Sequence, residues 1–236
     1  MLCPFAKREW MTLLAIGVLL SAAAAMLYWW WVVMAVIVVV AALLLFFRDP
    51  QRTIPSDRHV MVSPADGRVS SVHEVAHFEP FGGPATCVRV FLSVLDVHVN
   101  RSPCHARVAS VTHRPGKHLN ALNPQSADDN EANMILLHHP AHKRPVAAVR
   151  QVAGLLARTI CCNAKPGQII QRGQPIGIIK LGSTAELYVP AELEPKIAVK
   201  QGDHVTGGAT ILAHYSLIAS ADAPEDDVAQ AASVSV

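Results

Sequence analysis

Hydrophobic and polar positions divide the sequence into two parts. From Trp10 to Phe47 the chain carries no charged side chain, a pattern that predicts helix inside a membrane. A straight helix over this whole run would be roughly 57 Å long, whereas the hydrocarbon core of a bilayer is about 30 Å thick. We therefore expect two shorter spans, near Trp10–Leu27 and Val32–Phe47, in preference to one long tilted span.

The residues around this run favour a helical hairpin. Tyr28-Trp-Trp-Trp31 separates the two expected spans, and aromatic rings prefer the membrane–water interface. Lys7 and Arg8 precede the first span, and Arg48 and Arg52 follow the second, so both ends are expected on the cytoplasmic side. A cleaved signal peptide is disfavoured, because the apolar run is too long and no small-residue cleavage site follows it.

The rest of the chain has the pattern of a mainly β domain. Short runs rich in Val and Ile, separated by Gly or Pro, are typical of the strands of a barrel or sandwich. Strands are expected at Gly67–Val72, Cys87–Ser93, Val94–Asn100, Ala106–Thr112, Met134–Leu137, Ala147–Val152, Ile176–Lys180 and Ala185–Val189. The stretch Gln151–Ile160 is expected to extend a strand or to form a short helix.

These patterns give three regions. Residues 1–47 form the anchor, residues 48–218 form the β domain, and residues 219–236 form a tail. The tail has four acidic side chains, no basic ones, and is otherwise mostly Ala and Ser. Such a composition predicts disorder.

An internal repeat refines the expected fold. Gly167-Gln-Ile-Ile-Gln-Arg-Gly173-Gln-Pro-Ile176 recurs as Gly202-Asp-His-Val-Thr-Gly-Gly208-Ala-Thr-Ile211. The shared pattern predicts a turn, an inward apolar residue, a second turn and a new strand. It resembles the hammerhead turns of biotinyl and lipoyl carrier domains, which implies a barrel-sandwich hybrid. The lysine that a carrier domain modifies at a hairpin tip has no counterpart here.

Composition narrows the functional classes. The chain is 51% hydrophobic and 16% charged, and its net charge is +2. These values exclude a disordered chain, a coiled coil and a strongly basic nucleic-acid binder. The five cysteines, Cys3, Cys87, Cys104, Cys161 and Cys162, form no CxxC pair and are expected to be reduced thiols. The histidines of 138–142 are read as a surface loop, so no metal is expected.

A serine after a predicted strand is the first candidate for chemistry. Leu181-Gly182-Ser183-Thr184 interrupts what would otherwise be a continuous hairpin. Gly-Ser-Thr alone is ordinary turn chemistry. In this context, however, the Ser183 hydroxyl could attack the Gly182 carbonyl, form an ester and break the chain by β-elimination. A pyruvoyl group would then remain at the new N-terminus.

A polar pattern on a predicted strand is the second candidate. Alternation along Asp96-Val-His98-Val-Asn100-Arg101 would place Asp96, His98 and Asn100 on one face. That face is either solvated or a site, in which His98 moves protons near neutral pH and Arg101 binds an anion.

Asp66, in Pro64-Ala-Asp-Gly67, is the third candidate. Asp-Gly is first of all a turn signal. Together with His98 and Ser183, Asp66 would nevertheless complete a set of carboxylate, base and hydroxyl nucleophile.

Several motifs in one order carry a family resemblance. They are Phe47-Arg-Asp-Pro50, Pro64-Ala-Asp-Gly67, Asp96-Val-His-Val-Asn-Arg101, His113-Arg-Pro-Gly-Lys117, Asn130-Glu-Ala-Asn133 and Leu181-Gly-Ser183. From about residue 46 to 215 the sequence resembles the short, archaeal-type phosphatidylserine decarboxylases. The resemblance implies a membrane-bound proenzyme that cleaves itself between Gly182 and Ser183. The β chain (1–182) and the α chain (183–236) would stay together as a heterodimer.

The resemblance also implies the chemistry. The pyruvoyl group made from Ser183 would form a Schiff base with the serine amine of phosphatidylserine and accept the electrons released as CO₂ leaves, giving phosphatidylethanolamine. His98 would transfer protons, Asp66 would assist self-cleavage, and Arg101 and Asn100 would contact the substrate. Longer bacterial members have a second histidine three residues after the first, where this sequence has Arg101.

The expected function is therefore a lipid decarboxylase at the cytoplasmic face of the cell membrane, with a phospholipid and no nucleic acid as partner. One alternative is a non-catalytic, membrane-anchored adaptor built on a lipoyl-like barrel. Adaptors of that kind usually carry a long helical hairpin in the barrel, and no heptad pattern is found here. Another alternative keeps the pyruvoyl chemistry but uses a soluble amino acid, which the anchor disfavours.

Overall fold

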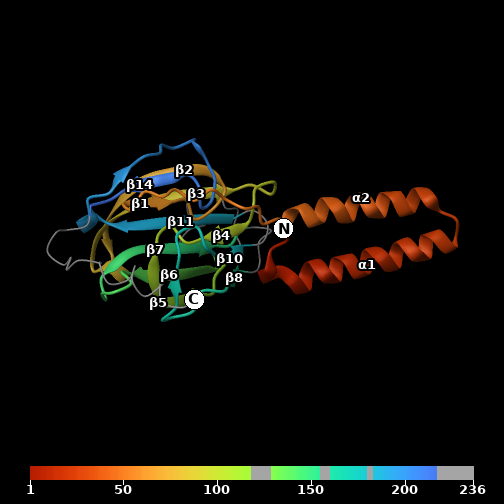
Figure 1. Cartoon of the computed structure of the whole chain (residues 1–236), viewed down its shortest axis with the longest axis horizontal. Coiled ribbons are helices and arrows are strands. Elements are labelled where there is room, and N and C mark those ends of the chain that lie inside the picture. Colours follow the sequence, from red (N-terminus) through yellow and green to blue (C-terminus); the bar gives the residue numbers. More distant parts are fainter. Residues whose placement is uncertain (118–128, 155–159, 180–182, 217–236) are drawn as a thin grey trace, which may run out of the picture.

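Two long helices extend from a β domain in the computed structural model, which describes residues 1–117, 129–154, 160–179 and 183–216 (Figure 1). The helices are α1 (Lys7–Met26) and α2 (Trp30–Phe46), with 3-10 turns η1 (Pro4–Ala6), η2 (Glu79–Phe81) and η3 (Ala191–Leu193). The strands are β1 (Val60–Val62), β2 (Gly67–Phe78), β3 (Gly83–Leu92), β4 (Val99–Arg101), β5 (Ala106–Arg114), β6 (Ala132–His138), β7 (Pro145–Val152), β8 (Ile160–Cys162), β9 (Ile169–Ile170), β10 (Pro175–Ile179), β11 (Ser183–Pro190), β12 (Lys196–Ile197), β13 (His204–Val205) and β14 (Ile211–His214).

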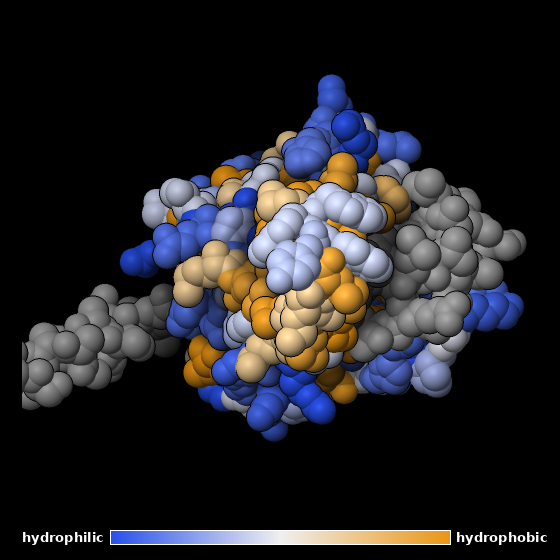
Figure 2. Space-filling model, turned by 90° about the vertical axis from the view of Figure 1, so that its right-hand side faces the viewer, coloured by the Kyte–Doolittle hydropathy of each residue, from blue (hydrophilic) through white to orange (hydrophobic). Residues whose placement is uncertain are grey.

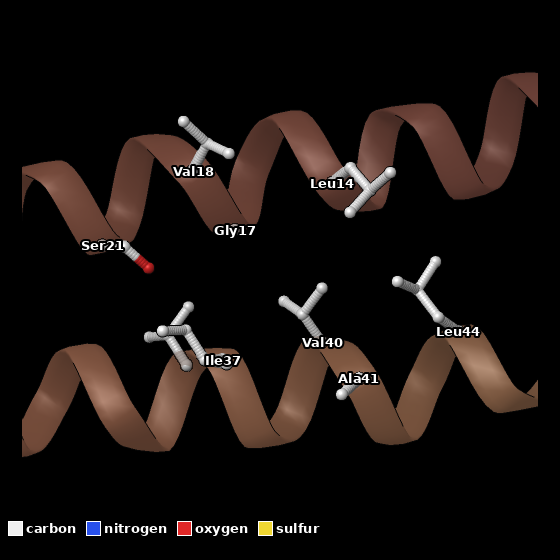
Figure 3. Close-up of a pocket in the computed structure, with 9 residues that line it drawn as sticks. Leu14, Gly17, Val18, Ser21, Ile37, Val40, Ala41 and Leu44 are labelled. Atoms are coloured by element: carbon white, nitrogen blue, oxygen red, sulfur yellow. The ribbon is translucent and has the colours of Figure 1, made fainter.

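Helices α1 and α2 lie side by side as an antiparallel hairpin (Figure 1). The turn is tighter than expected, because Trp30 already begins α2 and Tyr28 adopts a left-handed conformation with φ 59°. The helices approach closely at Gly17, where a Cβ atom would lie 2.7 Å from Val40 Cγ2 (Figure 3). The segment Pro4–Met26 is long and apolar enough to cross a membrane, and α2 is a shorter apolar helix.

The base of the hairpin is fixed to the β domain. The Cys3 amide donates to the Phe47 carbonyl at 2.8 Å, and the Asp49 amide donates to the Met1 carbonyl at 2.7 Å. Buried apolar residues from both parts form one cluster, comprising Cys3, Ala6, Val97, Val99 and Ile178. The anchor therefore continues into the packing around β4 and β10.

The β domain is built on one curled eight-stranded sheet, with the order β13-β2-β3-β11-β7-β6-β5-β9 (Figure 1). Two three-stranded sheets, β1-β14-β12 and β4-β10-β8, complete it. The prediction of a mainly β domain is confirmed. The five cysteines are free, and burial raises the pKa of Cys87 and of Cys104 to about 12.

One predicted strand was wrong over most of its length. Of Val94–Asn100, only the last two residues belong to a strand, β4. The chain turns before it, because the Asp96 carboxylate accepts hydrogen bonds from the Ser93 amide at 2.8 Å and the Ser93 hydroxyl at 2.7 Å. The predicted stretch Gln151–Ile160 is strand at both ends, and residues 155–159 lie outside the described part. The predicted tail, 219–236, also lies outside it.

The glycine repeat has the predicted arrangement of turns and strands. Gly167, Gly173, Gly202 and Gly208 have φ of 86°, 74°, 94° and 79°, a region that favours glycine. Between each pair of turns one apolar side chain is buried, from Ile170 in β9 and from Val205 in β13.

This repeat belongs to a larger internal two-fold relation that the sequence reasoning missed. Residues 57–69 and 96–108 share the pattern Asp-x-His-Val-x-x-Ser-Pro-x-x-x-Arg-Val. Their hydrogen bonds match as well, since the Val62 amide donates to the Pro103 carbonyl and the Arg101 amide donates to the Pro64 carbonyl, each at 2.9 Å.

The relation divides the domain into two halves. The first half contains β1–β3 and β11–β14, and the second half contains β4–β6 and β7–β10. Each contributes a three-stranded sheet and one side of the eight-stranded sheet, and the two sides meet where β11 pairs with β7. Residues in equivalent positions of the two halves are called mates below.

Candidate active site

Ser183 is the first residue of β11, the strand between β3 and β7 near the middle of the sheet. It pairs with Leu92 of β3 and is fully buried. Its Oγ has no hydrogen-bond partner among the described residues. A buried hydroxyl without a partner costs free energy, so Ser183 lowers the stability of the folded domain. Gly182, the other predicted cleavage residue, lies outside the described part.

Asp66 lies at the same end of the sheet as Ser183. It immediately precedes β2, and its carboxylate accepts hydrogen bonds from the Gly207 amide at 2.8 Å and from Arg52 Nη2 at 2.6 Å. Burial raises the pKa of Asp66 despite these two donors. Because β3 separates β2 from β11, about 10 Å separates the two backbones.

The adjacent Gly67 lets β2 begin against β3 at this point. Its φ is 148°, and a Cβ atom there would lie 2.1 Å from the Phe91 carbonyl oxygen. No other residue type fits this approach without moving the backbone. Asp66 can therefore be part of a turn and also lie at the end of the sheet where Ser183 is found.

His98 is fully buried beneath the hairpin. The Phe46 ring lies 4.3 Å from the His98 ring, centre to centre. His98 Nδ1 lies 2.8 Å from the Asp96 carbonyl oxygen. Because a carbonyl oxygen only accepts, Nδ1 carries the hydrogen, and the lone pair of the neutral ring lies on Nε2. Burial lowers the pKa of His98 to about 4, so the ring is neutral near pH 7.

The solvated-face interpretation of this segment was wrong. His98 and Asn100 are fully buried, as are their neighbours Val97 and Val99. The segment has no solvent-exposed polar face opposite an apolar one, because it runs between the hairpin base and the core and is covered on both sides. The alternative interpretation, a site, stays a prediction that the burial of His98 and Asn100 allows.

No hydrogen bond joins the three predicted catalytic groups in the described part of the chain. Ser183 Oγ has no partner, so neither His98 nor Asp66 is bonded to it. The His98 carbonyl nevertheless accepts from the amide of Ile179 at 3.3 Å, and Ile179 ends β10, shortly before Ser183. All three groups therefore lie at the end of the domain that faces the hairpin, where β11 begins (Figure 1).

Arg101 is held by the protein itself. Its guanidinium donates to the Asp49 carboxylate, to the Pro50 carbonyl at 3.1 Å and to the Gly173 carbonyl at 2.9 Å. A substrate anion would have to displace Asp49 from it. Arg101 thus fixes the segment after the hairpin to the β domain, and its predicted contact with the substrate stays a prediction.

Sequence reasoning missed four residues around these groups: Phe46 against His98, Arg52 against Asp66, and Gln151 and Asn133 behind Asn100. Gln151 Nε2 donates to Asn100 Oδ1 at 2.8 Å, and Asn133 Nδ2 donates to Gln151 Oε1 at 2.9 Å. Gln151 did give a signal, because it occupies the same face of β7 as two buried apolar residues. Arg52 and Phe46 gave none beyond their closeness to a quoted motif.

An apolar cavity of about 540 Å³ lies between the hairpin base and the turn before β4. Its lining includes Leu13, Leu43, Phe46, Arg48 and Leu95, and the exposed Leu95 presents its side chain there. The cavity shares Phe46 with the surroundings of His98, so one side chain separates the two. Within the described ranges, no group of His, Cys, Asp or Glu could hold a metal ion.

Comparison with known proteins gives one consistent result. Residues 40–213 match the family model described as phosphatidylserine decarboxylase. The chain is 42% identical over 167 residues to the phosphatidylserine decarboxylase proenzyme of Carboxydothermus hydrogenoformans, covering 71% of this chain and 76% of that protein. It is 39% identical over 175 residues to the proenzyme of the same name from Wolbachia sp. subsp. Brugia malayi, covering 72% and 74%.

Proposed function

The chain belongs to the phosphatidylserine decarboxylase family, and from this premise we propose that it decarboxylates phosphatidylserine with a pyruvoyl group made from its own Ser183. The activity follows from the family. The observation that supports Ser183 as the source is its buried Oγ, without a partner, at the start of the central strand. This environment fits a small, uncharged keto group, because no described side chain is bonded to the hydroxyl that would be lost.

Self-cleavage would run through an ester. Ser183 Oγ attacks the Gly182 carbonyl carbon, the peptide C–N bond breaks, and the nitrogen takes a proton. Loss of the Ser183 α-proton then breaks the Cβ–Oγ bond and leaves a carboxylate on Gly182. Water replaces the nitrogen of residue 183 as ammonia, which leaves the pyruvoyl group. Once formed, this group supplies an electron sink for decarboxylation.

His98 and Asp66 have separate parts in this proposal. Neutral His98, with its lone pair on Nε2, accepts and returns protons. Asp66, held by Arg52 and the Gly207 amide, assists self-cleavage from across β3. Arg101 and Asn100 remain the proposed contacts of the substrate headgroup, with Arg101 acting after Asp49 is displaced.

The hairpin would hold the enzyme at its substrate. We propose that α1 and α2 enter the bilayer from the cytoplasmic side and that the apolar cavity at the hairpin base receives lipid chains. Seen along the hairpin, an apolar column projects from a domain with hydrophilic residues around its base (Figure 2). The pyruvoyl end of β11 would then face the membrane. A proteolysis assay on sealed membrane vesicles with the cytoplasmic side outward should digest the β domain; protection of the domain would reverse this orientation.

The internal two-fold relation and its glycine turns support the barrel-sandwich class predicted from the repeat. The position of β11 supports a lasting heterodimer, because β11 of the α chain would lie between β3 and β7 of the β chain. The adaptor alternative has less support, since family membership implies catalysis.

Substitution of Ser183 tests the proposal. The Ser183→Ala variant, produced in membranes, should remain one full-length chain and form no phosphatidylethanolamine. The matched control is Thr184→Ala, which truncates the neighbouring buried side chain and should still be cleaved. Intact mass would detect the two chains, and lipid mass spectrometry would detect the product. Cleavage or decarboxylation by Ser183→Ala would overturn the assignment of Ser183.

A further inference from the structure

Three buried amide side chains form a line across the second half of the domain. Asn133 on β6, Gln151 on β7 and Asn100 on β4 are each almost or fully inaccessible to solvent. Asn133 Nδ2 donates to Gln151 Oε1 at 2.9 Å, and Gln151 Nε2 donates to Asn100 Oδ1 at 2.8 Å. We call these three residues the amide relay. Its bonds link the large sheet to the small sheet β4-β10-β8.

The fold itself does not require amides at these positions. The mates of Asn133, Gln151 and Asn100 in the first half are Thr86, Val189 and Met61; Val189 and Met61 are fully buried core residues, and Thr86 is partly buried. The same backbone thus accepts a triplet that contains no amide and has two apolar members. Burying three amides in its place gains little net stability even when they are bonded, so the relay calls for a reason other than packing.

The direction of the bonds leaves one donor free. Because Gln151 gives its Nε2 hydrogen to the oxygen of Asn100, Asn100 directs its own Nδ2 away from the relay. Asn100 Nδ2 is buried and has no hydrogen-bond partner among the described residues. An orphaned donor of this kind costs free energy. The relay therefore holds a hydrogen-bond donor ready at a fixed place.

The pairing register brings the relay to the strand that Ser183 begins. Asn100 pairs with Gly177 in β10, the strand that leads towards Ser183. Gln151 pairs with Ala185 in β11, two residues after Ser183 and on the same face of the strand. The relay thus contacts β10, which ends shortly before Ser183 in the chain, and lies next to β11, which Ser183 begins. Ser183 Oγ, the attacking atom, is the other buried orphan at this end of the domain.

We propose that the amide relay positions Asn100 Nδ2 to donate a hydrogen bond to the oxyanion that forms when Ser183 Oγ attacks the preceding carbonyl. As the C–O bond forms, the carbonyl electron pair moves to the oxygen, and Asn100 stabilises this charge without transferring a proton. The charge is lost when the peptide C–N bond breaks. Asn100 is then a catalytic residue, and Gln151 and Asn133 are positioning residues. The inference rests on the proposed self-cleavage at Ser183.

Reversing the relay tests the inference. A carboxylate introduced by Gln151→Glu can only accept hydrogen bonds. The side-chain amide of Asn100 would then turn to donate its Nδ2 hydrogen to this carboxylate, and Asn100 Oδ1 would face the reacting carbonyl. Asn133→Asp should act in the same way from further away, because it would reverse Gln151. The loss of one oxyanion donor slows a reaction by about 10²–10³-fold. We expect precursor cleavage, followed by intact mass after cell-free synthesis into nanodiscs, to slow by that factor in both variants.

A pH profile separates positioning from folding. When protonated, the carboxyl of Gln151→Glu can donate to Asn100 Oδ1 again, so cleavage by this variant should accelerate as the pH falls from about 9 to about 6. A loss of packing alone would not be repaired by acid. The matched control is Asn130→Ala, which removes a buried amide that donates to the Ala153 carbonyl at 2.7 Å, outside the relay. Folded Asn130→Ala should cleave at the normal rate.

The outcomes are distinct. Normal, pH-independent cleavage by folded Gln151→Glu and Asn100→Ala would overturn the inference while leaving Ser183 as the cleavage residue. Cleavage by Ser183→Ala would instead overturn the proposed function. If Gln151→Glu does not fold, Gln151→Val, which introduces the residue of its own mate, provides the same rate test.

Discussion

The two halves of the β domain share one backbone plan but use the same residues differently. The pattern Asp-x-His-Val-x-x-Ser-Pro occurs in both. In the second half its histidine, His98, is buried under Phe46, whereas in the first half its mate, His59, is exposed. The helical hairpin covers only one of the two equivalent ends. The contact partner, not the motif, therefore makes this histidine a candidate base.

The differences between mates gather around the site. Thr86, Val189 and Met61 of the first half become the amide relay in the second, and Ala213 of β14 becomes Gly177 of β10. Asp66 of the first half has His105 as its mate. Positions that hold the frame, such as Ser63 and Ser102, keep the same bond, from the hydroxyl to the carbonyl two residues on, at 2.6 and 2.8 Å.

The largest expected effect comes from making the halves alike. The triple variant Asn100→Met, Gln151→Val and Asn133→Thr replaces the amide relay with the residues of its mates. Cleavage should slow by about 10²–10³-fold, while the free energy of unfolding should be unchanged or higher, because these three residues already fit the same backbone in the first half. Urea unfolding in a Ser183→Ala background would measure stability. A large loss of stability would show that the halves are not interchangeable here.

A second prediction concerns the buried and the exposed histidine. Since burial lowers the pKa of His98 to about 4, the base form persists as the pH falls, and cleavage should be constant from about pH 8 to about pH 5 and slow below that. Phe46→Ala would admit water, raise the pKa of His98, and move this decline to higher pH by one to two units at most. Rates of precursor cleavage at each pH would measure the shift. His59→Gln, the control at the mate, should leave the profile unchanged; a shift there would remove the distinction between the two histidines.

The smallest predicted effect exchanges the glycine and alanine mates. A Cβ atom at Gly177 would lie 2.4 Å from the Cys161 carbonyl oxygen and 3.1 Å from Gln151 Nε2. Gly177→Ala should therefore lower the free energy of unfolding by about 1–3 kcal/mol and slow cleavage by displacing Gln151. Ala213→Gly should cost about 1 kcal/mol through chain entropy and leave the cleavage rate normal. Urea unfolding and intact mass would measure both, and equal cleavage rates would separate Gly177 from the relay.

Local patterns predicted the parts of the fold that depend on local chemistry. The charge-free run gave the two helices, and the glycine repeat gave four turns, because a left-handed backbone needs a residue without a side chain. The strand expected at Val94–Asn100 failed because the Asp96 carboxylate closes a turn that alternation does not reveal. Contacts between residues far apart in the sequence were not predicted either, since only the folded chain brings Gln151 to Asn100.

The candidate site was predictable only as far as its motifs reach. Ser183, His98 and Asp66 stood out because each lies in a short pattern with a chemical meaning. Phe46 ends the hairpin and Arg52 follows it. Nothing in the sequence of that segment reveals that these two side chains contact His98 and Asp66. The orphaned state of Ser183 Oγ is likewise a property of the packed domain.

The central position of β11 has a consequence for the order of events in the life of the chain. β11 is bounded on both sides by strands made earlier in synthesis, and every one of its residues is buried. If the bond before Ser183 were broken before the sheet closed, the last part of the chain could diffuse away. The proposed cleavage depends on groups from both halves and would therefore happen only after assembly. A chain that misfolds would thus remain inactive, and decarboxylase activity would appear only in molecules whose β domain has folded.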